Sequence, residues 1–230
     1  MKFLIPPSEG KSTKNLTNIH FKDTNFVYQK QVNQILRKLK DVEKKDFKKI
    51  YGTNEEKAKL IHKQNLQIKK LTCSPAIERY SGTVFSNIKY ESFSELEKEF
   101  FYEHFLIFSG FFGAVKPHTL IPNYKLKMNV LQLYKLWNPI LTKDLQKEDS
   151  IFDLLPQIHK KAYNHTENTF NLDFIIIKNG KKIPAGHFGK IIKGKFIHFI
   201  VKHQITKLED LIQFKDEGFK WDGKVFLNGE

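Results

Sequence analysis

A short loop near the start of the chain carries several side chains that could do chemistry. It runs Pro7-Ser8-Glu9-Gly10-Lys11-Ser12 and directly follows the apolar run Lys2 to Ile5. Gly-Lys-Ser after a strand suggests a phosphate-binding P-loop, but that motif needs a glycine five positions before the Gly-Lys pair, where this chain has Ile5. The loop therefore offers a lysine and hydroxyls without a P-loop phosphate cradle, and the alternative is a solvated turn.

A second candidate is the stretch Ser109-Gly110-Phe111-Phe112-Gly113, which is soon followed by Lys116-Pro117. We expect a helix, capped by Ser92 or Ser94, to run to about Phe108, and two glycines three apart after it suggest a tight hairpin with positive φ. Such a hairpin between helices can aim backbone N–H groups at a phosphate while Lys116 adds charge. A helix end with an ordinary packing turn is the alternative.

Two further segments are rich in lysine. The alternation from Tyr124 to Met128 predicts a half-buried strand that presents Lys125 and Lys127 on one face. A helical pattern from Gly189 to Gln204 places Lys190, Lys193 and Lys195 in its opening turns. Because basic groups at a helix start oppose the helix dipole, three of them together suggest that an anion sits there.

Histidines and acidic residues give no pattern typical of catalysis or metal binding. The near pairs His159/His165 and His198/His203 lack the i, i+4 spacing that puts two ligands on one helical face, and the acidic residues that could act in pairs are widely separated. No Gly-x-Ser-x-Gly motif is present. The sequence predicts no metal and no cofactor.

Composition points to an anionic partner inside the cell. Lys and Arg number 39 against 25 Asp and Glu, a formal charge of +14, although an AT-biased, lysine-rich sequence could also produce this charge. The single Cys73 excludes an internal disulfide and favours a reducing compartment. The first apolar run is too short for a signal peptide, and no run approaches the roughly 20 residues of a membrane span. We therefore expect a cytoplasmic protein that does not bind membranes.

The sequence patterns of the helices and strands that must position these side chains predict an α/β (α+β) fold. We expect a single compact domain over residues 1–230 with a mixed sheet and flanking helices. Helical patterns cover residues 26–65, 94–108, 131–145 and 189–204. The run from Phe174 to Lys178, closed by Asn179-Gly180, predicts a buried core strand with a hairpin turn, and an Asp222-Gly223 turn predicts a second hairpin. The strands are expected near residues 2–5, 82–86, 123–128, 173–178, 219–221 and 224–227.

Several motifs, taken in order, resemble the YaaA family of peroxide stress proteins. The most specific is the block from Ser109 to Met128, and the resemblance covers essentially the whole chain. Its motifs are Leu4-Ile5-Pro6-Pro7-Ser8-Glu9-Gly10-Lys11, Glu78-Arg79-Tyr80-Ser81-Gly82, Ser109-Gly110-Phe111-Phe112-Gly113-Ala114-Val115-Lys116-Pro117, Ile121-Pro122-Asn123-Tyr124-Lys125-Leu126-Lys127-Met128, Leu133-Tyr134-x-x-Trp137, Lys193-Gly194 and Asp216-Glu217-Gly218-Phe219.

The resemblance implies a family-specific compact α/β fold with a helix-hairpin-helix element, a positively charged cleft, duplex DNA binding and a role in limiting iron-driven damage during peroxide stress. Many relatives carry Arg-Pro and Arg-Gly where this chain has Lys116-Pro117 and Lys193-Gly194, so a bidentate guanidinium grip on phosphate is lost. Carried over by position, the DNA contacts are Ser109, Gly110, Gly113 and Lys116 in the hairpin, and Lys11, Arg79, Lys125, Lys127, Lys190 and Lys193 in the cleft.

The leading hypothesis is a protein that binds double-stranded DNA without strong sequence preference. The alternative is an enzyme acting on a nucleotide or nucleic acid in the same cleft, although the residues favour binding over catalysis. A third possibility, direct sequestration of iron, has no carboxylate and histidine pattern to support it. The candidate catalytic residues of the alternative are Ser8, Glu9, Lys11, Arg79 and Tyr80.

Overall fold

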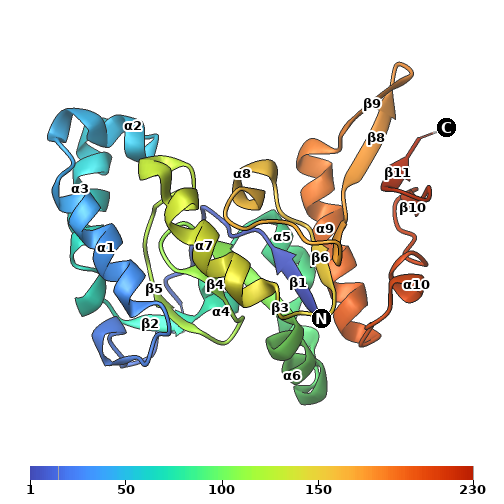
Figure 1. Cartoon of the computed structure of the whole chain (residues 1–230), viewed down its shortest axis with the longest axis horizontal. Helices are drawn as coiled ribbons and strands as arrows, with labels where there is room; N and C mark the ends of the chain where they lie inside the picture. Colours follow the sequence, from blue (N-terminus) through green and yellow to red (C-terminus); the bar gives the residue numbers. More distant parts are fainter. Residues whose placement is uncertain (15, 230) are drawn as a thin grey trace.

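The centre of the molecule is a five-stranded sheet (Figure 1). The computed structural model describes residues 1–14 and 16–229. In sheet order the strands are β4 (Gly113–Val115), β3 (Phe105–Ser109), β1 (Lys2–Ile5), β6 (Ile151–Asp153) and β7 (Thr169–Asn171). Strand β1 is parallel to both β3 and β6, β7 is parallel to β6, and β4 is antiparallel to β3. The three middle strands are almost entirely buried, as expected for parallel strands covered on both faces.

Aromatic rings tie the three middle strands together. The ring of Phe3 in β1 stacks on Phe105 of β3 at 4.7 Å between centroids and on Phe152 of β6 at 5.1 Å. The same residues are register partners across the two parallel pairs. Large aromatic side chains bury much apolar surface, so this ladder fixes the register of the strands whose ends build the candidate site.

The N-terminal helices form a lobe on the left of Figure 1, where α3 packs against both α1 and α2. Between this lobe and the central sheet, a short antiparallel pair joins β2 (Cys73–Pro75) to β5 (Leu120–Pro122). The lobe consists of α1 (Gln29–Lys40), α2 (Phe47–Tyr51) and α3 (Glu55–Leu66), whereas α4 (Ala76–Arg79), α6 (Glu95–His104) and α7 (Leu133–Leu145) lie nearer the centre of Figure 1.

The C-terminal part lies on the right of Figure 1 and contains a second sheet, in the order β10-β11-β8-β9. Its strands are β8 (Phe174–Lys178), β9 (Lys181–Pro184), β10 (Lys220–Trp221) and β11 (Phe226–Asn228). The helices here are α9 (Gly186–Lys202) and α10 (Leu208–Leu211), and α5 (Thr83–Ile88) and α8 (Gln157–Lys160) lie near the centre of Figure 1. Short 3-10 turns cover Phe21–Asp23, Lys44–Asp46, Ile68–Lys70, Tyr90–Ser92 and Val130–Gln132.

Helices α5 and α9 approach each other closely because α9 has a glycine at the contact. A Cβ atom on Gly194 would lie 2.4 Å from the carbonyl oxygen of Val84 and 2.5 Å from Cβ of Asn87. Only a residue without a side chain lets the two backbones come this near. This contact places the start of α5 and the first turns of α9 side by side, where both border the candidate site.

Several predicted elements are confirmed. The first strand and both C-terminal hairpins are present, and the helix expected from Gly189 to Gln204 is α9, which begins three residues earlier at Gly186. Asn179 and Gly180 both have positive φ, as expected for the two-residue turn between β8 and β9. Ser94 is the N-cap of α6 and forms a reciprocal capping box with Glu97. The predicted α/β fold is therefore correct.

Three predictions of secondary structure are wrong. Residues 82–86 were expected as a strand but begin helix α5, whose buried Val84, Phe85 and Ile88 form one helical face against the core. The helix expected to reach Phe108 ends at His104, because the following apolar run is the central strand β3. The Gly110 to Gly113 hairpin therefore joins two antiparallel strands rather than two helices.

The third error concerns residues 123–128, which form no strand. Their alternation is nevertheless correct, since Tyr124, Leu126 and Met128 are buried while Lys127 is exposed. The buried side chain of Asn65 in α3 pairs with this segment instead of a neighbouring strand: its Nδ2 donates to the Lys125 carbonyl at 2.9 Å and its Oδ1 accepts from the Lys125 N–H at 3.3 Å. Side-chain amides thus satisfy the backbone that a sheet would otherwise pair.

The strand Phe174–Lys178 was expected in the buried core but lies in the second sheet, with Ile175 to Ile177 only half-buried. Its continuous apolar sequence reflects packing on one face and partial cover on the other. Within the described residues, none of the helices has the length and apolar character needed to cross a membrane.

Candidate functional site

The candidate site lies beyond the carboxyl ends of the middle strands. After β1 the chain continues through Pro6 and Pro7 into the Ser8 to Lys11 loop, β3 is followed by Gly110, and β6 is followed by Leu155 and Pro156, and residues of all three segments line one cavity. Strand β1 has β3 on one side and β6 on the other, so the connections that leave the sheet from β1 and β3 lead to opposite sides of β1. Ligands of open α/β sheets bind at such a switch point, outside the strand carboxyl ends.

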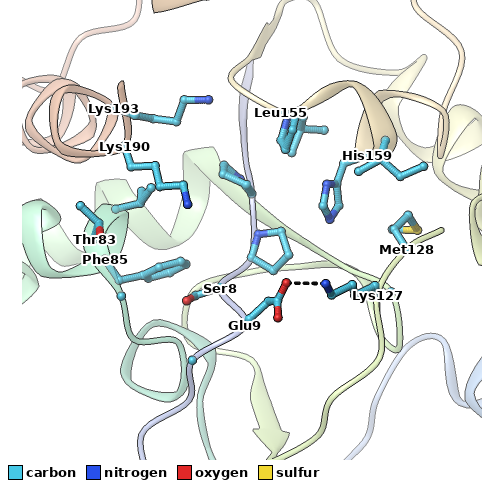
Figure 2. A pocket seen from close by; sticks show the side chains of 18 of the residues that line it. Ser8, Glu9, Thr83, Phe85, Lys127, Met128, Leu155, His159, Lys190 and Lys193 are labelled. Carbon is cyan, nitrogen blue, oxygen red and sulfur yellow. Dashed lines mark ion pairs between the residues drawn. The ribbon is translucent and has the colours of Figure 1, made fainter. Parts of the chain in front are cut away.

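The cavity has a volume of about 950 Å³. Its other walls are the start of α5 from Gly82 to Phe85, the segment from Tyr124 to Asn129, α8 with Ile158 and His159, and the junction from Pro184 to Lys193 between the second sheet and α9. Figure 2 shows side chains from these segments pointing into a shared space. Segments from across the chain therefore build one pocket.

Five lysines line this cavity against two carboxylates, Glu9 and Asp173. Figure 2 shows Lys190 and Lys127 on opposite sides of the pocket, with Lys127 paired to Glu9 at 2.7 Å. Lys193 donates to the carbonyl of Leu154. Within residues 1–14 and 16–229, neither Lys125 nor Lys190 has an ion-pair partner, so both amines are available to an anion. The five are Lys11, Lys125, Lys127, Lys190 and Lys193.

The amine of Lys11 occupies an unusual position. It donates to the carbonyl of Ser8 at 3.0 Å and lies 4.3 Å from the ring centroid of Tyr124 and 5.3 Å from that of Tyr80. The pKa of Lys11 is lowered to about 7, chiefly by burial; the charge of Glu9 opposes this shift, and those of Arg79 and Lys125 add to it. A bound anion would favour the charged form of this amine.

Other groups in the pocket are also tuned by their surroundings. Burial lowers the pKa of Lys193 to about 8. Burial, with the nearby charge of Lys193, lowers the pKa of His159 to about 4, so its imidazole is neutral at physiological pH. The hydrogen bond from Lys127 holds the pKa of Glu9 below its ordinary value. At physiological pH the Glu9 carboxylate is therefore charged and the His159 imidazole is neutral. The buried amines of Lys11 and Lys193 are only partly charged until an anion binds.

Tyr80 and Ser109 support the cavity wall without lining the cavity themselves. Both are buried, and neither is among the residues that line the cavity. The hydroxyl of Tyr124 lies 2.6 Å from that of Tyr80 and 2.7 Å from Oγ of Ser109. Ser109 Oγ also accepts the N–H groups of the hairpin at Phe112 (2.9 Å) and Phe111 (3.1 Å). These residues position the ring against which Lys11 lies.

Arg79 does not line the cleft, which corrects the sequence-based prediction. Its side chain is buried, and its guanidinium donates to the Ser12 carbonyl at 2.5 Å, to Ser74 Oγ at 2.9 Å and to the Ile121 carbonyl at 3.4 Å. These acceptors join three chain segments. Because its side chain is buried and all three of its nitrogens donate to groups inside the protein, Arg79 acts as a structural cross-link and does not line the pocket.

The DNA contacts predicted in the hairpin lie at different places in the structure, and not all of them line the cavity. Gly110 lines the cavity, and a Cβ atom there would lie 2.6 Å from the Leu126 carbonyl oxygen. Gly113 has φ of +69° and packs against Trp137, where a Cβ atom would lie 2.6 Å from the indole ring. Lys116 is exposed and is not among the lining residues. Of this group, only Gly110 therefore belongs to the pocket.

The lining residues that were not identified from the sequence as parts of a site include Thr83, Phe85 and His159. His159 follows the short strand β6 by way of Pro156. A strand ending before a polar segment would have been the signal, but three residues are too few to predict β6. In the described part of the chain, no three His, Cys, Asp or Glu side chains are grouped to hold a metal ion.

Residues 1–225 match the family model described as Peroxide stress protein YaaA. The chain belongs to the YaaA family. Similar proteins include a UPF0246 protein of Rickettsia bellii, 28% identical over 95% of this chain and 94% of the relative, and one of Clostridioides difficile, 28% identical over 94% of each. A UPF0246 protein of Fusobacterium nucleatum is 26% identical over 95% of this chain and 92% of its own length. The resemblance to the YaaA family is thereby confirmed.

Proposed function

We infer that this member of the peroxide stress protein family binds double-stranded DNA through its backbone phosphates, and that such binding limits iron-driven damage to DNA during peroxide stress. The observation that supports this function is the convergence of five lysines, from three parts of the chain, on one cavity with only two carboxylates. Two of these amines are unpaired among the described residues, and a third, Lys11, gains charge when an anion arrives. Net charge alone, +14, is weaker support because most lysines lie elsewhere.

Contact through lysine implies little sequence preference. An ammonium group is a point charge that attracts phosphate without the bidentate geometry by which arginine reads guanine edges. Phosphate contacts fix the position of a protein on a duplex and carry no direct sequence information. Duplexes of unrelated sequence should therefore bind with similar affinity.

A fluorescence titration of labelled duplexes at low salt tests the proposed function. We expect binding by the wild-type protein and weaker binding by Lys127→Gln, because this change removes one amine and leaves the Glu9 carboxylate uncompensated beside the DNA. Lys116→Gln, outside the cavity, serves as the matched comparison. An unchanged affinity in Lys127→Gln with a loss in Lys116→Gln would place the DNA over the β3–β4 hairpin instead of the cleft.

The side chains that line the pocket also favour a second candidate, an enzyme acting on a nucleotide or nucleic acid. Ser8, Glu9 and Lys11 lie on one loop of the pocket, and an amine with a pKa of about 7 is partly neutral at physiological pH, as a lysine base or nucleophile must be. Incubation of mononucleotides and DNA with wild type and Lys11→Gln, followed by product analysis, tests it. A product formed by wild type and not by the variant would support catalysis, and the absence of any product would refute it.

A further inference from the structure

The pocket is the wrong size for a double helix. Its volume of about 950 Å³ falls at the upper end of the range for pockets that enclose a small molecule, about 300–1,000 Å³. A duplex cannot enter such a space, since its major groove alone is about 12 Å wide. The body of a duplex must therefore stay outside the pocket while its backbone phosphates approach the lysine amines, and the interior is left for something smaller.

The walls combine two chemistries. Lysine amines reach in from α9 and from the segment that carries Lys127, as Figure 2 shows for Lys190 and Lys127. Apolar and flat side chains supply much of the remaining lining, among them Pro6, Phe85 and Leu155. A nucleotide has the matching parts, an anionic phosphate and a flat, largely apolar base that stacks on rings and apolar surfaces.

His159 lies in this wall and has a ring nitrogen without a hydrogen-bond partner. Its Nδ1 is buried and has no hydrogen-bond partner among the described residues, and its ring points into the pocket in Figure 2. Buried polar atoms are normally paired, so the unpaired Nδ1 marks a ring that can reorient to pair with a ligand when the cavity is filled. A neutral imidazole can donate or accept, which suits the polar edge of a base.

We propose that the cavity receives one nucleotide unit, with its phosphate among the lysine amines and its base between the apolar walls and His159. The nucleotide comes from the strand that the cleft holds, displaced from the duplex into the pocket, and this source rests on the DNA binding inferred above. Displacement costs unstacking and unpairing energy, which is least at a mismatched or unpaired position. The protein should therefore bind duplexes with such positions more tightly than fully paired ones.

A space-filling substitution at Thr83 tests the proposal. Thr83 begins α5 and is half-buried in the pocket wall, so Thr83→Trp places a large ring in the cavity with little change elsewhere. Ser86→Trp is the matched control, because Ser86 lies on the same helix, is exposed and does not line the pocket. Calorimetry with deoxyadenosine monophosphate, deoxyadenosine and inorganic phosphate measures the pocket, and titration with paired and mismatched duplexes measures displacement.

We expect the monophosphate to bind more tightly than either the nucleoside or phosphate, and a mismatched duplex to bind about tenfold more tightly than the paired one. Thr83→Trp should abolish both preferences and retain binding of the paired duplex, whereas Ser86→Trp should change neither. Equal binding of paired and mismatched duplexes would overturn the displacement and leave DNA binding intact. Absence of duplex binding with Thr83-dependent binding of the monophosphate would refute the DNA function and identify a site for free nucleotides.

Discussion

DNA affinity should fall as the pH rises through neutrality, because Lys11 loses its charge there. Its pKa in the free protein is about 7, lowered chiefly by burial. A phosphate beside the amine favours the charged form and returns the pKa toward the ordinary lysine value of about 10.4. Binding then takes up a proton at any pH between these two values, so the affinity is full below about pH 7 and declines above it.

The size of this decline follows from the two pKa values. At pH 6 about nine-tenths of Lys11 amines in the free protein are charged, and at pH 8.5 only about 3%, so Lys11 alone should lower the affinity for a duplex about 30-fold between these pH values. An ordinary exposed lysine would produce almost no change in the same window. Backbone phosphodiesters do not titrate there, which makes DNA a better probe than a phosphomonoester.

Fluorescence anisotropy of a labelled duplex at constant ionic strength, measured from pH 6 to 8.5, provides the assay. Lys11→Gln keeps a donor for the Ser8 carbonyl and removes the titrating amine, so it should bind more weakly than wild type at pH 6 and should lose most of the pH dependence. Lys193, with a pKa of about 8, accounts for a smaller decline that the variant retains. Equal pH dependence in wild type and Lys11→Gln would refute the assignment of Lys11 to the phosphate site.

The remaining predictions concern the scaffold of the site. Asn65→Ala leaves the Lys125 N–H and carbonyl unpaired and should lower the free energy of unfolding by about 1–3 kcal/mol in urea denaturation, with Lys63→Ala on the same helix as the control. Gly194→Ala pushes against α5 and should cost about 1–3 kcal/mol by the same measurement; an unchanged urea midpoint would show that the two helices separate freely. Arg79→Gln should lower the thermal unfolding temperature while the DNA affinity of the folded variant stays unchanged, and a selective loss of DNA affinity would show that Arg79 contacts DNA after all.

Local sequence rules correctly predicted the elements whose residues strongly favour a single backbone conformation. Asn179-Gly180 adopts positive φ at both positions, so the hairpin turn after the strand Phe174–Lys178 could be placed from two residues. Ser94 and Glu97 similarly mark the start of α6. The Ser8 to Lys11 loop was identified as a candidate because it follows a short strand, and it does form part of the pocket.

Long-range pairing decided the elements that local rules missed. The run from Phe105 to Ser109 continues an apolar helix in sequence, and only its pairing with β1 makes it a strand. Lys125 lies in a segment with strand-like alternation whose backbone pairs with Asn65, some 60 positions earlier in the chain. Arg79 has the residue type of a phosphate ligand, but its guanidinium donates to two backbone carbonyls and a serine hydroxyl contributed by other segments. No local pattern records such contacts.

The salt dependence of duplex binding tests the central inference most directly. Wild-type affinity should fall steeply with rising salt, and Lys190→Gln should reduce the slope of log K against log salt by about 1, since each neutralised phosphate releases about one counterion. Lys38→Gln, an exposed lysine on α1 in the opposite lobe, should leave the slope unchanged. Absence of duplex binding at low salt, or equal slopes for Lys190→Gln and Lys38→Gln, would contradict a phosphate-binding role for the cleft.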